Sequence, residues 1–502
     1  MLIDCREISD GHTLSCDVCI IGAGAAGITL AKSYLSSNLS VCLMESGDFK
    51  SDAETQALYK GWTVFNGSEK KESYLHGSRL RFFGGSTNHW AGWCRPLDPV
   101  DFKKRDWVDY SGWPIDQSVL KPYYSVAADL VEIDPFKEYI NEERGCSGDD
   151  AIINSENMCS KYFHFSPPTR FGIKYRRELV EADTIKLCTN ANAQTIELNE
   201  NGDKVDYVKF ETLTGVHFKV AAKITIVATG GIENARLLLL SNSVQRNGIG
   251  NQHDQLGRYF MDHPHYPHAA NIVFSDIPEN LDKYDRSKNP KSFAALGFTD
   301  NMQKKNHLLN TAMQIVTPRN NPREVRDAAD VFGLFDRWRV GKDHDNRDKS
   351  GLFLGQLLMI SELNPDPNNR IELDNEVDRF GLQKGKLTLD LTRQHLKTVT
   401  KSIELFAVEL AKLSNGRIRI AFNEDNPTRN YFPANHHSGT TRMSAEEKTG
   451  VVDSNCKVHG VSNLYIAGSS VFPTTGFSNP TFTILALAQR LSDHVRSILN
   501  HG

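Results

Sequence analysis

The feature that most constrains the fold is a glycine-rich loop that follows an apolar run near the N-terminus. The apolar residues 18–21 lead into the spacing G-x-G-x-x-G, formed by Gly22, Gly24 and Gly27. Residues 25–35 then carry apolar side chains at helical spacing, and a second apolar run, 41–44, ends at Glu45. A strand, glycine loop, helix and second strand followed by an acid are typical of a dinucleotide-binding β-α-β unit.

Each part of this unit has a separate physical role. The first glycine permits a tight turn, the second lets the backbone approach a pyrophosphate, and the third lets helix and strand pack closely. Ala25 and Ala26 begin the helix, where unpaired N–H groups and the positive end of the dipole attract phosphate. Glu45, with Ser46 beside it, is expected to accept hydrogen bonds from ribose hydroxyls. The pattern alone does not distinguish FAD from NAD.

Length and composition limit the other possibilities. A chain of 502 residues suggests two or three domains, and a net charge of −4 gives no indication of nucleic-acid binding. The longest apolar run, around residues 237–240, is far shorter than a membrane span, and the first fifteen residues carry no secretory pattern. Nine scattered cysteines favour free thiols in a reducing compartment, so we expect a cytoplasmic protein. The oligomeric state stays open, a homo-oligomer included.

Other elements are indicated by periodicity. We expect helices at residues 120–131, 233–241 and 394–413, and strands at 185–188, 205–213, 217–220 and 224–228. Residues 51–77 are expected to be irregular, and the basic run 337–349 is interpreted as a solvated loop. His263, His265 and His268 are not expected to bind metal, because the intervening prolines break the ligand geometry.

The C-terminal part holds candidates for proton chemistry. His436 begins the segment His-His-Ser-Gly-Thr, and Asn479 precedes Pro480 and Thr481, which open a long amphipathic segment. Asparagine is a good N-cap and proline suits the first helical position, so a helix is expected to begin here. Neutral imidazole can take a proton near pH 7, and an amide can orient a hydroxyl group beside it.

Further blocks lie between these ends. Arg81 opens a segment that contains Gly84, Gly85, Asn88 and His89. A strand-like run ends at Ala228-Thr229-Gly230, and the run 464–467 leads to Gly468 and Ser469. A Gly-Arg-Tyr-Phe-Met-Asp-His-Pro block spans residues 257–264. Together with the two terminal motifs, these blocks resemble the glucose-methanol-choline (GMC) oxidoreductases, nearest in motif detail to the pyranose oxidase and cholesterol oxidase branches.

The resemblance implies an α/β fold with a discontinuous Rossmann-like FAD-binding domain and a sheet-based α+β substrate domain. The FAD-binding parts would be residues 1–135, 185–264 and 431–502, with a connecting or lid segment at 136–184 and the substrate domain at 265–430. It further implies that the blocks around Gly85, Thr229 and Ser469 contact FAD and that the helix after Asn479 points at the flavin. Members with covalent FAD carry a histidine at the offset of His89; the alternative is that His89 only lines the flavin edge.

The function implied is oxidation of a CH–OH group, with His436 as base, Asn479 orienting the hydroxyl group and FAD accepting the hydride. The substrate would be a polar alcohol of the sugar, glycoside or cyclitol type. Two alternatives stay open: a flavin-containing lyase without net redox chemistry, and a flavoprotein subunit of a dehydrogenase complex. Oxygen or a separate electron acceptor would reoxidise the flavin.

Overall fold

The computed structural model describes residues 1–68, 73–133, 155–274, 291–316, 353–413, 417–428 and 431–501. The basic run 337–349 and residues 136–154 of the expected connecting segment 136–184 lie outside these residues. The eight cysteines that are described are all free thiols. Within the same ranges, no helix is both long and apolar enough to cross a membrane.

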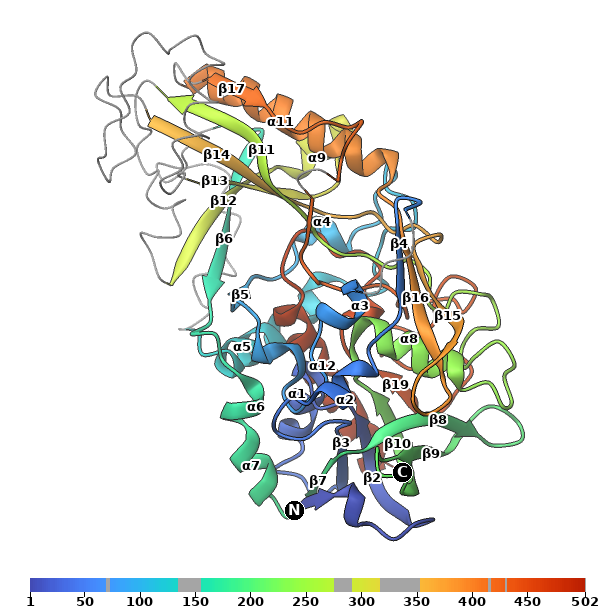
Figure 1. Cartoon of the computed structure of the whole chain (residues 1–502). Coiled ribbons are helices and arrows are strands. Elements are labelled where there is room, and N and C mark those ends of the chain that lie inside the picture. Colours follow the sequence, from blue (N-terminus) through green and yellow to red (C-terminus); the bar gives the residue numbers. More distant parts are fainter. Residues whose placement is uncertain are drawn as a thin grey trace.

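The first sheet is mainly parallel and carries the glycine loop (Figure 1). Its strands run in the order β1 (Leu2–Asp4), β7 (Ile185–Thr189), β3 (Val41–Met44), β2 (Thr13–Ile21), β10 (His217–Val227), β9 (Val205–Glu211) and β8 (Asn192–Leu198), and β19 (Leu464–Ile466) also pairs with β10. β9 pairs antiparallel with both β10 and β8, and the other strand pairs of this sheet are parallel. The last four residues of β2 and all of β3 are buried, as expected for strands covered on both faces.

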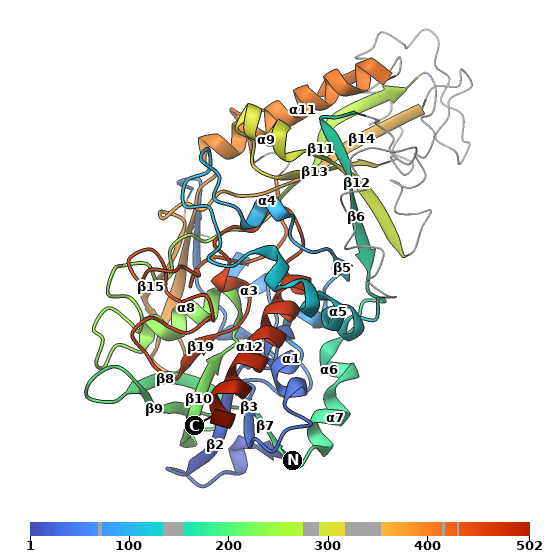
Figure 2. The same ribbon diagram turned by 180° about the vertical axis from the view of Figure 1, so that it is seen from behind.

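Three helices lie side by side against one another near this sheet: α1 (Ala25–Ser33), α12 (Thr481–His501) and α5 (Lys121–Leu130) (Figure 2). α8 (Gly230–Leu240) packs against β8 and against β15 of another sheet. The shorter helices are α2 (Ala53–Ala57), α3 (Ser73–Gly77), α4 (Pro99–Phe102), α6 (Phe171–Lys174) and α7 (Arg176–Glu181).

The second sheet lies at the other end of the molecule (Figure 1). Its order is β17 (Arg417–Ile420), β11 (Pro264–Phe274), β14 (Phe353–Ser361), β13 (Thr311–Val316), β12 (Ser292–Phe298), β6 (Met158–Phe165) and β5 (Trp93–Cys94), and β18 (Phe432–Pro433) pairs with β11. α11 (Arg393–Leu413) buries Val399, Ile403, Phe406 and Leu410 in this sheet's core, and α9 (Asp300–Asn306) lies nearby. The spacing of these four side chains gives the helix one apolar face.

A third sheet consists of β15 (Arg370–Val377), β16 (Gln383–Leu389) and β4 (Trp62–Phe65). The α/β fold class is thus confirmed, whereas two local predictions were wrong. Residues 51–77 contain β4, α2 and α3 instead of an irregular segment. The two strands expected at 217–220 and 224–228 are one strand, β10, because β2 pairs along nearly its whole length. α12 begins at Thr481, one residue after the expected first helical position, and the Asn479 side chain bonds to His436.

Candidate active site

The candidate site is built where four parallel strands end. Gly22 follows β2, Glu45 follows β3, Ala228 follows β10 and Ala467 follows β19, and these strands are neighbours in the sheet. Ligands of open α/β sheets bind at the carboxyl ends of such strands. A cavity of about 890 Å³ opens at this place and is lined by all four residues.

The glycine loop has the shape that its sequence predicts. Gly22 has φ +102°, and a Cβ there would meet the Ala228 carbonyl oxygen at 2.7 Å. A Cβ on Gly27 would lie 1.8 Å from the Gly22 carbonyl oxygen, so the third glycine is needed for helix and strand to pack. A Cβ on Gly24 would meet no protein atom within 4 Å. Because Gly24 lines the cavity at the start of α1, it leaves a cradle beside the helix N-terminus.

Glu45 supports this loop. Its carboxylate accepts hydrogen bonds from the backbone N–H groups of Ala23 and Gly47, both at 3.0 Å, and from the Ser46 hydroxyl at 3.3 Å. Glu45 and Ser46 both line the cavity. The carboxylate therefore ties the glycine loop to the end of β3, and its further acceptor capacity is available to a ribose hydroxyl.

The cavity wall also carries an excess of positive charge. Buried Glu233 pairs with Arg79 at 2.8 Å, with Arg236 at 3.2 Å and with Arg81 at 3.7 Å. Arg236 also pairs with Asp378 at 2.7 Å, so the three arginines face two carboxylates. The Nε atom of Arg81 is buried without a hydrogen-bond partner, and the residue lines the cavity. These features fit an anionic group such as a pyrophosphate.

The second glycine-containing block packs directly on the first loop. Gly84 donates its backbone N–H to the Ala23 carbonyl at 2.8 Å, and a Cβ on Gly85 would lie 3.1 Å from the Gly24 Cα. The Asn88 side chain donates to two carbonyls of its own segment, those of Phe83 and Gly85. This close approach places the whole block at the cavity.

Most of the predicted site residues line this one cavity: Gly22, Gly24, Ala25, Ala26, Glu45, Ser46, Arg81, Gly85, His89, Ala228, Thr229, Gly230, His436, Gly468, Ser469, Asn479, Pro480 and Thr481. Gly27, Gly84 and Asn88 are not among its lining residues, and they act through packing and hydrogen bonds in the loops behind it. Five segments that are far apart in the chain thus meet at one site: 22–46, 81–89, 228–230, the segment at 436 and 468–481.

The predicted proton acceptor lies in the same wall. The Asn479 amide Nδ2 is 3.1 Å from His436 Nε2, and His436 Nδ1 is 2.9 Å from His263 Nδ1. Burial, together with the neighbouring histidines 263, 265 and 437, lowers the pKa of His436 well below its usual value. The imidazole is therefore neutral near pH 7, and one of its two nitrogens is unprotonated and can receive a proton.

A buried carboxylate organises the segment around this histidine. Asp262 accepts hydrogen bonds from the backbone N–H of His436 at 2.8 Å and of His263 at 2.7 Å. It also accepts from the Tyr74 hydroxyl at 2.9 Å, and Tyr74 is 3.1 Å from His437 Nε2. Burial raises the pKa of Asp262, while these hydrogen bonds to it act in the opposite direction.

Three of these residues were not predicted from the sequence as parts of the site: Tyr74, Asp262 and His263. The block at 257–264 was noted, but its pairing with residue 436 spans 173 positions. The residue that signals this pairing is Gly439. It has φ +88°, and a Cβ there would meet the Tyr259 carbonyl oxygen at 2.0 Å. Within the described part of the chain, no group of His, Cys, Asp or Glu is arranged to hold a metal ion.

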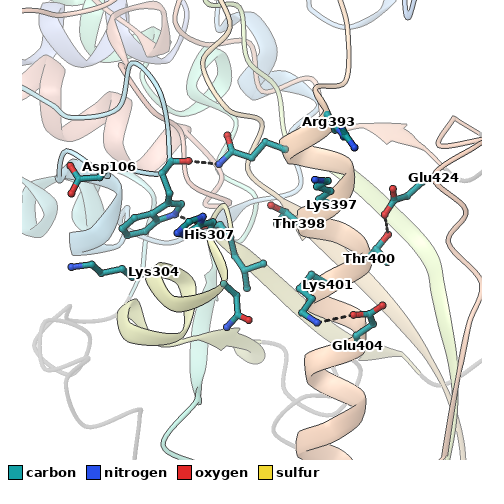
Figure 3. A pocket seen from close by; sticks show the side chains of 14 residues that line it. Asp106, Lys304, His307, Arg393, Lys397, Thr398, Thr400, Lys401, Glu404 and Glu424 are labelled. Atoms are coloured by element: carbon teal, nitrogen blue, oxygen red, sulfur yellow. Dashed lines mark hydrogen bonds and ion pairs between the residues drawn. The ribbon is translucent and has the colours of Figure 1, made fainter.

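A second cavity, of about 980 Å³, lies between α11, α9 and Trp107 (Figure 3). Arg393, Lys397 and Lys401 line it from successive turns of α11, and Lys304 lies opposite on α9. Asp106, Glu404 and Glu424 line the same cavity, and Lys401 pairs with Glu404 at 3.0 Å. None of the predicted site residues is found there.

Comparison with known proteins agrees with this architecture. The family model described as GMC oxidoreductase matches residues 363–488. The fructose dehydrogenase large subunit of Gluconobacter japonicus is 25% identical over 98% of this chain and 99% of its own. The 6'''-hydroxyparomomycin C oxidase of Streptomyces lividus is 24% identical over 97% and 91%. The crystal structure of pyridoxine 4-oxidase from Mesorbium loti superposes with a TM-score of 0.58 at 15% identity, over 96% and 99%.

Residues 363–488 thus match the GMC oxidoreductase family, and the chain is similar over nearly its full length to a dehydrogenase subunit and an oxidase. It is therefore an FAD-dependent oxidoreductase, and the donor set at the cavity is consistent with FAD. The glycine cradle, the acid after β3 and the uncompensated positive charge beside Arg81 match the pyrophosphate and ribose of such a cofactor.

Proposed function

We propose that this chain oxidises a CH–OH group to a carbonyl group and that His436 is the base. The observation that carries the proposal is the pair formed by His436 Nε2 and the Asn479 amide, 3.1 Å apart. Both residues line the same cavity as the glycine loop. A hydroxyl oxygen that contacts both groups would be held beside the cofactor site.

The reaction requires the hydroxyl proton to leave as the C–H bond breaks. His436 takes this proton at Nε2, and the Asn479 amide hydrogen-bonds the same oxygen and orients the carbon. FAD, when bound, supplies the acceptor for the hydride. Glu45 and the glycine loop hold its adenosine and phosphate parts, while Pro480 and Thr481 place the N-terminus of α12 at the cavity.

α12 contributes electrostatically to the proposed site. A helix N-terminus carries positive dipole character and stabilises negative charge nearby. The helix is 21 residues long, and its first residue, Thr481, lines the cavity. Negative charge that develops on the electron acceptor would therefore be stabilised from this side.

The substrate is proposed to be a polar alcohol of the sugar, glycoside or cyclitol type. The relatives named above act, by their names, on fructose and on a hydroxyparomomycin. The segment 265–430 contributes His265, Pro267 and Leu358 to the cavity, so we assign substrate binding to this segment. The His265 imidazole is the polar group among these three side chains.

The test is His436→Ala in the flavin-loaded enzyme. Anaerobic flavin reduction by a responsive sugar or alcohol should slow by ~10²–10⁴-fold, because a general base contributes about this factor. Flavin content should not change. The control is His268→Ala on the exposed surface of β11, which should reduce at the wild-type rate. Normal reduction by the His436 variant would refute the assignment.

A second candidate function is that of a flavoprotein subunit with a separate electron acceptor. It is favoured by the likeness to the fructose dehydrogenase large subunit over nearly the full length of both chains. Reoxidation kinetics separate the two cases: an oxidase is reoxidised rapidly by oxygen, whereas a dehydrogenase subunit reacts with quinone or dye acceptors instead. The names of the relatives, oxidases and dehydrogenases, favour either case over a lyase.

A covalent bond from FAD to His89 is a separate hypothesis. His89 lines the cavity and its ring is partly exposed. Denaturation followed by filtration tests the bond, since covalent flavin stays with the protein and the His89→Ala variant then releases it. Flavin in the wild-type filtrate would leave His89 as a residue that only lines the site.

A further inference from the structure

The chain pairs His436 with a second buried histidine, His263. The Nδ1 atoms of the two rings are 2.9 Å apart, and the ring planes are inclined at 73°. The pairing follows from the backbone, because Met261 and Ser438 form an antiparallel bridge with two hydrogen bonds of 3.0 Å. In this register, the residues two positions beyond the bridge on each segment, 263 and 436, lie opposite each other.

The contacts determine where the protons sit. Two ring nitrogens 2.9 Å apart share one proton, since a neutral imidazole has one donor and one acceptor. The Asn479 amide donates to His436 Nε2, so the proton of His436 is on Nδ1 and is donated to His263 Nδ1. The proton of His263 is then on Nε2. Burial and His265 lower the pKa of His263 to about 3, while the backbone of Thr475 and Gly476 acts in the opposite direction. Its Nε2 atom is buried without a hydrogen-bond partner.

We infer that His263 is a positioning residue for His436. It keeps Nε2 of His436 unprotonated, and it shares the positive charge of the imidazolium once His436 has taken a proton. This inference rests on the proposed function of His436. In the step itself, the substrate O–H bond breaks and an N–H bond forms at His436 Nε2. The Nδ1–H of the resulting imidazolium is donated to His263, and the hydride leaves the carbon for the flavin.

Burial and the neighbouring histidines oppose a positive charge on either ring of the pair. His265 acts on both rings and His437 on His436, and each lowers the pKa of the ring it acts on. Asp262 accepts from the backbone N–H of both members, and its carboxylate is also bonded to Tyr74. Behind the loop at Gly476 lies Asp101, whose pKa is raised to about 8 by burial and by nearby carboxylates.

The experiment compares His263→Leu with His263→Asn in the flavin-loaded enzyme. Leucine removes the acceptor for His436 Nδ1–H, whereas the Asn Oδ1 restores an acceptor near the same place but takes up no proton. Anaerobic flavin reduction is followed against pH by stopped flow. We expect His263→Leu to lower the rate of flavin reduction at the plateau of the pH profile by ~10–10²-fold. This is part of the factor that a general base contributes.

The pH profile separates positioning from a structural role. Because the imidazolium form loses its hydrogen-bond acceptor, the acid limb of the His263→Leu profile should move to lower pH. The plateau rate of His263→Asn should be at least ~10-fold higher than that of His263→Leu. His268→Leu, on the exposed surface of the same strand, should reproduce the wild-type profile.

The outcomes distinguish this inference from the proposed function. If His436→Ala reduces flavin normally, the base assignment itself has failed. If His436→Ala is slow but His263→Leu keeps the wild-type rate and acid limb, only the inference about His263 is overturned. Equal losses in the Leu and Asn variants with an unshifted acid limb would also overturn it.

Discussion

Two glycine-to-alanine substitutions in the same loop should have opposite consequences. Gly27→Ala places a methyl group 1.8 Å from the Gly22 carbonyl oxygen, whereas Gly24→Ala meets no protein atom within 4 Å. The first clash involves backbone on both sides, so the loop must shift. The second methyl group fills the cradle beside the N-terminus of α1.

The magnitudes follow from these distances. Overpacking costs roughly 1–3 kcal/mol, and the upper part of this range suits a clash with backbone. Replacing a helical glycine by alanine returns about 1 kcal/mol, so Gly27→Ala should destabilise the apoprotein by about 2 kcal/mol. Gly24 has φ −85° and extended backbone, which alanine adopts freely. Gly24→Ala should therefore leave stability within ~0.5 kcal/mol, or raise it slightly.

The assay uses apoprotein produced under flavin limitation. Thermal unfolding should show a lower Tm for Gly27→Ala and an unchanged Tm for Gly24→Ala. Titration with FAD, followed by flavin fluorescence, should show binding more than ~10-fold weaker for Gly24→Ala, a loss of about 1.4 kcal/mol. If Gly24→Ala binds FAD with wild-type affinity, the pyrophosphate does not approach the backbone here, and the reasoning is refuted.

Two further predictions concern buried ion pairs. Burial acts to raise the pKa of Glu233, but its three arginines outweigh this and lower the pKa to about 2. An acid whose pKa is lower in the folded state stabilises the fold at pH values above its ordinary pKa, here 4.5. This stabilisation is lost as the pH falls towards 2. Glu233→Gln should therefore flatten the acid-unfolding profile between these two pH values. Glu362→Gln should cost about 3–5 kcal/mol in urea unfolding, because it weakens a bidentate pair with fully buried Arg105. An unchanged midpoint in either variant would contradict its prediction.

Much of the first sheet could be predicted from the sequence because its signals are local. β2, the loop, α1 and β3 follow one another within about thirty residues, and the structure has them within a few residues of the expected bounds, except that β2 begins earlier. The long helices α11 and α12 were also found, because each buries one face at a regular spacing. These elements carry their pattern in their own sequence.

The elements that were missed depend on distant partners. β4 has four residues and pairs with β16, more than 300 positions later, so its own sequence carries little signal. β10 looked like two strands, since Ala221 and Ala222 interrupt the apolar pattern, but β2 pairs through the interruption. His263 was noted inside a motif, yet its role appears only once the segment at 438 is folded beside it. Long-range pairing supplied what local pattern could not.

The order of the strands has a consequence for synthesis of the protein. β2 and β3 are synthesised early, but β19 supplies Ala467 and pairs with β10, Gly468 follows it, and α12 begins at Thr481. A nascent chain therefore cannot complete the cofactor cavity until residues beyond 481 have left the ribosome. Flavin binding then reports that translation has passed this point, and chains that stop earlier would remain without an assembled site and exposed to proteolysis.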